Sequence, residues 1–196
     1  MNRNDLIREV SAATPDPERA FKNLERLLQD SPEFFEEHKQ QIESIANLFS
    51  YSQFLADYCI KNPSRLSYAL RHLNDPVRKE DIISEVRDLY KITVDSFSNQ
   101  FKQESMKALR KLRKDYLLKI TLKDITGITG IDECMTELSI LSEVIIQVAL
   151  DVSIVLMARK FGHMKDNAFA VIGLGKLGAG ELNYSSDIDI ISSKKR

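Results

Sequence analysis

Apolar residues recur at helical spacing along most of the chain, from the N-terminus to about residue 162. Several of these runs open with a capping residue followed by proline, as in Asp16-Pro17 and Ser31-Pro32, which is typical of a helix start. Only Gly127 and Gly130 interrupt this region before Gly162. The pattern predicts a succession of amphipathic helices, among them Ser52–Ile60, Ser64–Leu73, Glu104–Asp124 and Asp132–Lys160.

The helix expected over Asp132–Lys160 is apolar on more than one face in its second half. A helix of that kind is normally covered on most sides, so it is predicted to lie at the centre of a helical bundle. Its most apolar part, Val144–Ala158, is interrupted by Gln147 and Asp151. This stretch is therefore predicted to be too short to span a bilayer.

The last thirty or so residues have a different pattern. Ala168–Ile172 is a short apolar run with aromatic and β-branched residues, which indicates a buried strand, and Ile188–Ile191 is a second strand candidate. Between them, four of the seven glycines fall within eight positions: Gly173, Gly175, Gly178 and Gly180. The predicted fold is mainly α, with a helical region over residues 1–162 followed by the truncated start of an α/β domain over 163–196.

Composition narrows the class of protein. Apolar residues make up 43% of the chain and charged residues 29%, as in soluble globular proteins. The 28 Lys and Arg against 29 Asp and Glu leave a formal charge of -1, which argues against a nucleic-acid-binding protein. Cys59 and Cys134 have no metal-binding spacing, and Met1–Val10 does not resemble a signal peptide. A cytoplasmic protein with no membrane and no nucleic-acid partner is predicted.

The glycine cluster matches G-x-G-x-x-G over Gly173–Gly178, the pattern of a dinucleotide-binding turn. That fold needs a full crossover helix, a further strand and an acidic residue roughly 20 positions on. Only 18 residues follow Gly178, and Lys176–Leu182 is too short for such a helix. A Walker A loop is excluded because no GK[ST] is present. The dinucleotide interpretation is therefore disfavoured.

Asp187 and Asp189 stand two positions apart in an apolar, strand-like run. Alternate side chains of a strand point to the same face, so both carboxylates are expected on one side of the strand. Adjacent carboxylates repel unless a cation or a shared proton relieves them. Hard oxygen ligands of this kind suit Mg²⁺, which commonly takes one or two carboxylates and completes its shell with phosphate and water.

A strand, a glycine turn, a short helix and an apolar-flanked acid pair together resemble the core of the polymerase-β-like nucleotidyltransferases. The 18 residues from Gly173 to Ile190 closely resemble the motif of the bifunctional glutamine synthetase adenylyltransferase/adenylyl-removing enzyme family. Fainter likeness extends upstream, through Ser52–Asp57, Leu109–Lys123 and Glu137–Ser139. A helical leader of this length resembles the N-terminal half of that family, which removes AMP from the modified tyrosine of glutamine synthetase by phosphorolysis.

This resemblance implies a set of site residues and partners. Asp187 and Asp189 would hold Mg²⁺ as metal ligands and catalytic residues, with ATP or ADP as the nucleotide substrate or product. For Ser185 and Ser186 a turn or capping role stays open beside a phosphate contact. The implied partners are glutamine synthetase and a PII-type signalling protein. The residues implied to lie against nucleotide phosphates are Gly173, Gly175, Lys176, Ser185 and Ser186.

The sequence departs from the family pattern after Ile191. The family continues with further strands, one of which carries a third carboxylate, whereas here Ser192-Ser193-Lys194-Lys195-Arg196 follows. The chain is interpreted as a truncated or excised piece that is inactive alone, although its family is enzymatic. Two alternatives stay open: a non-catalytic helical interaction module, and a small stand-alone nucleotidyltransferase that obtains its missing acids from elsewhere.

Overall fold

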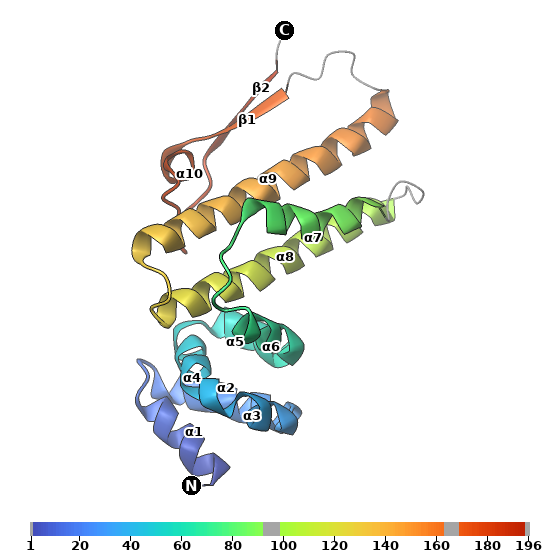
Figure 1. Ribbon diagram of the computed structural model, residues 1–196. Coiled ribbons are helices and arrows are strands. Elements are labelled where there is room, and N and C mark those ends of the chain that lie inside the picture. The colour runs from blue at the N-terminus through green and yellow to red at the C-terminus, as the bar shows by residue number, and fades with distance from the viewer. Residues whose placement is uncertain (1, 92–98, 163–168, 195–196) are drawn as a thin grey trace. The chain divides into compact units, whose positions relative to one another are not determined.

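The computed structural model describes residues 2–91, 99–162 and 169–194, and these are mainly helical, as the sequence predicts (Figure 1). Their contacts divide the chain into two compact units. We call Met1–Asp75 with Lys114–Thr129 the helical unit, and Pro76–Arg113 with Gly130–Arg196 the hairpin unit. The sequence suggests a domain boundary at residue 162, where the helical pattern gives way to a strand pattern. The contacts divide the chain at other positions, so this boundary stays a prediction.

The helical unit is built from short helices whose starts are encoded locally. Pro17, Pro32 and Pro63 each occupy a first helical position, and the Asp16 side chain accepts a hydrogen bond from the backbone N–H of Arg19 at 3.0 Å. The elements are α1 (Arg3–Ala12), α2 (Pro17–Asp30), α3 (Pro32–His38), a 3₁₀ turn (Lys39–Gln41), α4 (Ile42–Tyr51), α5 (Gln53–Lys61), α6 (Pro63–Arg71) and the second part of α8 (Asn99–Ile125).

One continuous apolar core holds the helical unit together. Leu24, Leu27, Ile45 and Phe49 are each 0% exposed, and Leu118 of α8 joins the same cluster. Burial of each such side chain stabilises the fold by about 1.5–3 kcal/mol relative to exposure. These buried side chains therefore hold the helical unit together.

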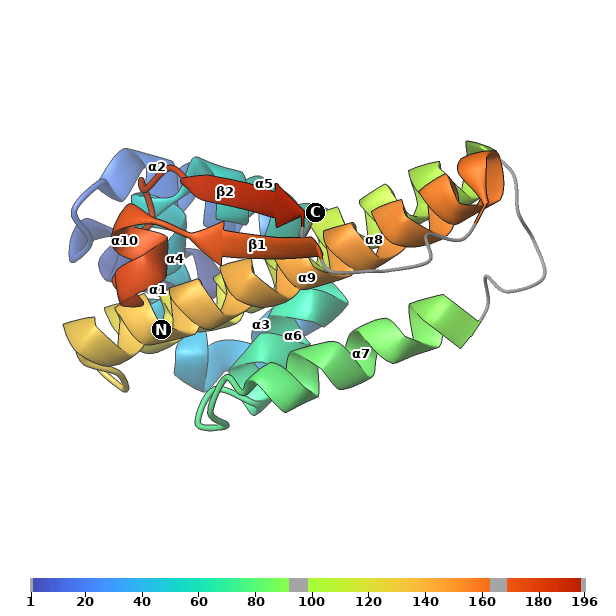
Figure 2. The ribbon, with the colours of Figure 1, turned by 90° about the horizontal axis from the view of Figure 1, so that it is seen from above.

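The hairpin unit combines α7 (Lys79–Lys91), the first part of α8 and α9 (Ile131–Phe161) with β1 (Phe169–Gly173), α10 (Gly175–Ala179) and β2 (Ile190–Lys194). The backbone N–H of Val77 donates to the Glu137 carboxylate at 3.2 Å, and Lys79 pairs with Glu143 at 3.2 Å, which ties the start of α7 to α9. Figures 1 and 2 show the strands running side by side along α9.

The strands form an antiparallel two-stranded sheet. Its register runs from Phe169 opposite Lys194 to Gly173 opposite Ile190. The first strand was predicted from Ala168, which lies outside the described residues, and the second from Ile188. That second boundary is wrong by two residues: β1 ends at Gly173 as the chain turns into α10, and among the described residues the pairing extends before Ile190 by a single backbone hydrogen bond, from Leu174 to Asp189.

The long helix α9 has nearly the predicted bounds but not the predicted burial. Within α9, no residue after Val148 is buried, and Met157 and Phe161 are 53% and 71% exposed. The expectation that its second half lies at the centre of a bundle is wrong for the described residues, because helical periodicity shows which positions are apolar but not what covers them.

By length and composition alone, α9 is also capable of crossing a membrane, which corrects the prediction that its apolar stretch is too short. An 18-residue window with few charges passes this test, and 22% of that window is buried. The core helix of a soluble protein passes the same test, so this finding by itself gives α9 no membrane location.

Candidate metal and nucleotide site

The glycine turn between β1 and α10 requires glycine for two reasons. Gly175, the first residue of α10, has a φ of +53°, in the left-handed region that side chains disfavour. At Gly178, a Cβ atom would lie 2.6 Å from the carbonyl oxygen of Gly173. This turn therefore brings the end of β1 and the short helix α10 into direct backbone contact.

The acid pair lies directly against this turn. The backbone N–H of Leu174 donates to the Asp189 carbonyl oxygen at 2.8 Å, which continues the strand pairing by one bond. The Asp189 Oδ2 atom lies 3.4 Å from the position that a Cβ on Gly175 would occupy. The backbone bond and this short distance place the second carboxylate beside the glycine turn. That Asp187 and Asp189 share one face stays a prediction.

Both carboxylates are exposed, and neither forms an ion pair with any of the cationic side chains that the structure describes. Lys176 of α10 is likewise exposed. Two neighbouring carboxylates with no cationic partner are a donor set that fits a hard divalent ion. Across the described ranges, no group of three or more His, Cys, Asp or Glu side chains is arranged to hold a metal, so the pair is the whole donor set found at this site.

A tight polar turn precedes the acids. The Asn183 Oδ1 atom accepts hydrogen bonds from the Ser185 backbone N–H at 3.1 Å, the Ser185 hydroxyl at 3.2 Å and the Ser186 hydroxyl at 2.9 Å. In return, the Asn183 backbone N–H donates to Ser186 Oγ at 3.1 Å. Both serine hydroxyls therefore serve the turn, the role that the sequence left open beside a phosphate contact.

Two side chains of α9 contact the segment that leads into this turn and forms it. The backbone N–H of Leu182 donates to Ser139 Oγ at 3.1 Å, and the Leu182 side chain is 3% exposed. Two residues on, the Tyr184 hydroxyl lies 3.4 Å from Cys134 Sγ. Sequence reasoning did not identify Ser139 or Cys134 as site residues. The faint family likeness over Glu137–Ser139 was the only signal that pointed there.

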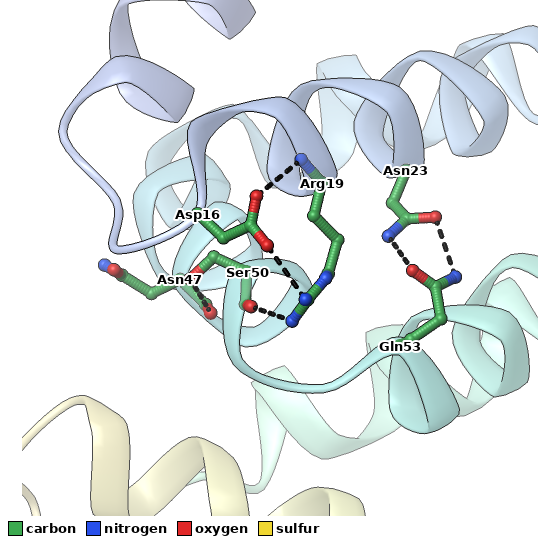
Figure 3. A network of polar contacts seen from close by, with 6 residues as sticks. All are labelled: Asp16, Arg19, Asn23, Asn47, Ser50 and Gln53. Carbon is green, nitrogen blue, oxygen red and sulfur yellow. Dashed lines mark hydrogen bonds and ion pairs between the residues drawn. The ribbon is translucent and has the colours of Figure 1, made fainter.

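A second polar cluster lies in the helical unit, over α2, α4 and α5 (Figure 3). Asn23 and Gln53 exchange reciprocal amide hydrogen bonds of 3.0 and 3.2 Å. Arg19 pairs with Asp16 at 2.8 Å and donates to the Ser50 carbonyl oxygen at 2.8 Å. These groups satisfy one another, so the cluster serves to join helices.

In the helical unit, burial is the main cause of a shifted pKa at three titratable groups. Burial raises the pKa of the Cys59 thiol. Burial, reinforced by a hydrogen bond to Asp115, raises the pKa of the Tyr58 hydroxyl. Burial lowers the pKa of His38, whose ring Nε2 lies 2.7 Å from Ser67 Oγ. These shifts follow from packing in the helical unit.

Residues 42–195 match a family model of adenylyltransferases. The family is described as glutamate-ammonia ligase adenylyltransferase, and because the match spans more than half of the chain, the chain belongs to this family. The resemblance found in the sequence is confirmed, and with it an enzymatic family.

Similar curated proteins carry the name bifunctional glutamine synthetase adenylyltransferase/adenylyl-removing enzyme. The Bartonella quintana protein is 33% identical over 87% of this chain and 17% of its own length. The proteins of Aromatoleum aromaticum and Vibrio parahaemolyticus are 28% and 29% identical, over 93% and 81% of this chain and 20% and 17% of their own lengths. The chain thus spans about a fifth of the length of the curated relatives it matches.

Proposed function

We propose that this chain supplies the helical leader and the first metal-binding elements of an adenylyl-removing site that acts on glutamine synthetase. The observation that carries the proposal is the exposed pair Asp187 and Asp189, without a described cationic partner, beside a glycine turn in a chain of this family. The names of the relatives support glutamine synthetase as the substrate. The N-terminal, adenylyl-removing half is the finer part of the proposal.

The reaction is a phosphorolysis. An oxygen of hydrogen phosphate attacks the phosphorus of tyrosine-bound AMP, and the bond from that phosphorus to the tyrosine oxygen breaks. The tyrosine oxygen takes up the proton that the phosphate loses, and the products are ADP and the free tyrosine. The attacking phosphate and the AMP phosphate group are both negatively charged. The rate of the step therefore depends on holding the two groups in position and on neutralising their charge. Mg²⁺, when bound, neutralises the phosphate oxygens and polarises the reacting phosphorus.

The residues of the turn have matching roles. Asp187 and Asp189 hold the metal ion. Gly175 leaves the backbone open to a phosphate oxygen, and Lys176 adds a positive charge next to it. Gly173 is the last residue of β1 and directly precedes the turn. The hydroxyls of Ser185 and Ser186 donate to Asn183, so each would have to give up that hydrogen bond before it could donate to a phosphate oxygen.

The protein partners and the location of the reaction are proposed from the family to which the chain belongs. A PII-type signalling protein is proposed as a second protein partner of the longer enzyme, and the cytoplasm as its location. The 196 residues alone supply two carboxylates at the site, so we expect them to bind a divalent ion but not to turn over substrate.

Metal binding tests the acid pair directly. Mn²⁺ titrations of the 196-residue chain, followed by electron paramagnetic resonance, are expected to show one site that Mg²⁺ displaces. Asp187→Asn and Asp189→Asn are each expected to weaken it about tenfold or more, since each removes one of the two anionic ligands. Asp132→Asn is the control, because Asp132 is an exposed acid in the first turn of α9. Equal affinity in all four proteins would refute the site.

A second measurement separates the alternatives. The chain is incubated with adenylylated glutamine synthetase, Mg²⁺ and phosphate, and ADP release is followed. Absence of release together with Mn²⁺ binding supports the proposal. Release of ADP by these residues alone would contradict the expected inactivity. Binding to glutamine synthetase without any Mn²⁺ site would favour the non-catalytic helical interaction module.

A further inference from the structure

We propose that Ser139 of α9 is a positioning residue for the acid pair, acting through the backbone of Leu182. This inference rests on the proposed function, because it assigns Ser139 to the same metal site. Ser139 lies 48 positions before Asp187 in the sequence and contacts neither carboxylate. Its effect on the site is exerted through the chain that leads into the acids.

The Ser139 hydroxyl is used in both directions. It donates to the Met135 carbonyl oxygen at 2.8 Å, one helical turn earlier, and accepts from the Leu182 backbone N–H at 3.1 Å. Ser139 and Leu182 are each 3% exposed, so water has little access to replace either bond. A buried N–H that loses its acceptor costs about 1–3 kcal/mol, which strongly favours keeping this contact.

The contact is connected to the acids through a hydrogen-bonded turn. Leu182 is followed at once by Asn183, whose side chain gathers Ser185 and Ser186 into one closed turn. Asp187 comes directly after that turn. We therefore expect a displacement of Leu182 to shift this turn and, with it, the first carboxylate.

The site is also supported from a second point on α9. Cys134 lies five positions before Ser139, and its Sγ atom meets the Tyr184 hydroxyl at 3.4 Å. Of these two contacts, the one made by Ser139 is the shorter and uses the stronger hydrogen-bonding group.

The same helix supplies a matched control. Ser153 also donates its hydroxyl to the carbonyl oxygen four residues earlier, Ala149, at 2.7 Å, but it is exposed. Ser153→Ala removes the same type of helix bond as Ser139→Ala without touching the loop. The two variants thus share the loss of the helix bond and differ in the contact with Leu182 and in burial, and the exchange of the Leu182 loop separates these two differences.

The test measures Mn²⁺ affinity of the full 196-residue chain alongside its urea unfolding and hydrogen exchange over residues 181–186. Ser139→Ala is expected to weaken Mn²⁺ binding about tenfold, the usual size for loss of a supporting contact, and to speed exchange in that loop. Ser153→Ala is expected to match the unaltered chain. Equal Mn²⁺ affinity for Ser139→Ala and the unaltered chain would overturn the proposal.

An isosteric pair keeps the test decisive if the alanine variant fails to fold. Ser139→Thr retains the hydroxyl and Ser139→Val replaces it with a methyl group of the same shape, so any crowding is equal in the two. The threonine variant is expected to bind Mn²⁺ more tightly than the valine variant, and equal affinities would overturn the proposal. If the unaltered chain binds no Mn²⁺, the proposed function fails, whereas loop exchange still decides whether Ser139 holds Leu182.

Discussion

The core of the helical unit and the sheet of the hairpin unit differ in how far they bury their apolar side chains. In the helical unit, Phe49 is completely buried, and polar partners such as Asn23 and Gln53 satisfy each other. In the hairpin unit, Ile172 and Ile191 lie opposite each other in the sheet and are 52% and 51% exposed.

The buried core contributes most to the stability of the fold, whereas the exposed hairpin carries the residues proposed to bind the metal ion. Buried apolar contacts give the helical unit its free energy of unfolding, whereas a segment with few such contacts opens at lower cost. A carboxylate that already has a cationic partner is a poor metal ligand. The acids of the hairpin unit lack such a partner among the described cations, and they are therefore available for binding.

The largest expected effect is a truncation in the buried core. Phe49→Ala is expected to lower the free energy of unfolding by about 3–5 kcal/mol, because it removes a fully buried ring and leaves a cavity. Ile191→Ala, on the exposed sheet, is expected to change it by less than about 1 kcal/mol. Urea unfolding followed by circular dichroism compares the two. Similar losses for both variants would erase the distinction between the units.

The next effect concerns the glycine turn. Gly178→Ala is expected to destabilise the hairpin by about 1–3 kcal/mol, since its Cβ would lie 2.6 Å from the Gly173 carbonyl oxygen. Hydrogen exchange over β1 and α10 measures this local change. Gly130→Ala is the control, because no atom lies within 4 Å of a Cβ at that position. Unchanged exchange in the Gly178 variant would show that the turn yields easily.

A smaller effect is expected from the polar contacts of the helical unit. Tyr58→Phe removes the hydrogen bond that Tyr58 donates to the partly buried Asp115 carboxylate, which also lies 3.6 Å from Arg65. The expected loss is about 1–2 kcal/mol in the free energy of unfolding. Tyr68→Phe, at a 49% exposed ring, is the control and is expected to be neutral. Equal losses would mean that Asp115 does not depend on Tyr58.

The smallest expected effect is on the pH dependence of stability. Burial lowers the pKa of His38 below its ordinary value of about 6.5, so the unfolded chain binds this proton more readily than the folded one. The contribution of His38 is complete above about pH 6.5 and is lost as the pH falls below it. We expect His38→Gln to flatten this part of the urea-midpoint profile, with His72→Gln as the control. A profile that keeps its slope in the His38 variant would contradict this.

Much of the fold is encoded locally and was predictable. The proline starts of α2 and α3 and the bounds of α9 depend on neighbouring residues, and the sequence indicates them correctly. The burial of α9 and the start of β2 depend on which segments lie opposite, and both predictions were wrong. Ile188 has the composition of a strand residue, but β1 has already turned into α10 at that level, so it has no partner strand.

The candidate site also has a part that the sequence predicts and a part that only the structure shows. The glycine spacing and the pair Asp187 and Asp189 are contiguous in the sequence, and the motif alone suggests their chemistry. The support from Ser139 joins residues 43 positions apart. A serine among apolar helix residues looks like an ordinary small side chain, so its link to Leu182 is visible only in three dimensions.

The pairing of β1 with β2 has a consequence for the order of folding. Phe169 meets Lys194, 25 positions on, and Gly173 meets Ile190, 17 positions on, whereas Leu182 must reach back 43 positions to Ser139. Hairpins close within about 1–10 μs, and longer loops close at greater entropic cost. Pulse-labelled exchange is expected to protect strand amides before the Leu182 amide, and the reverse order would contradict this. The two strands would thus pair first, and the loop that carries Leu182 would dock against the long helix last.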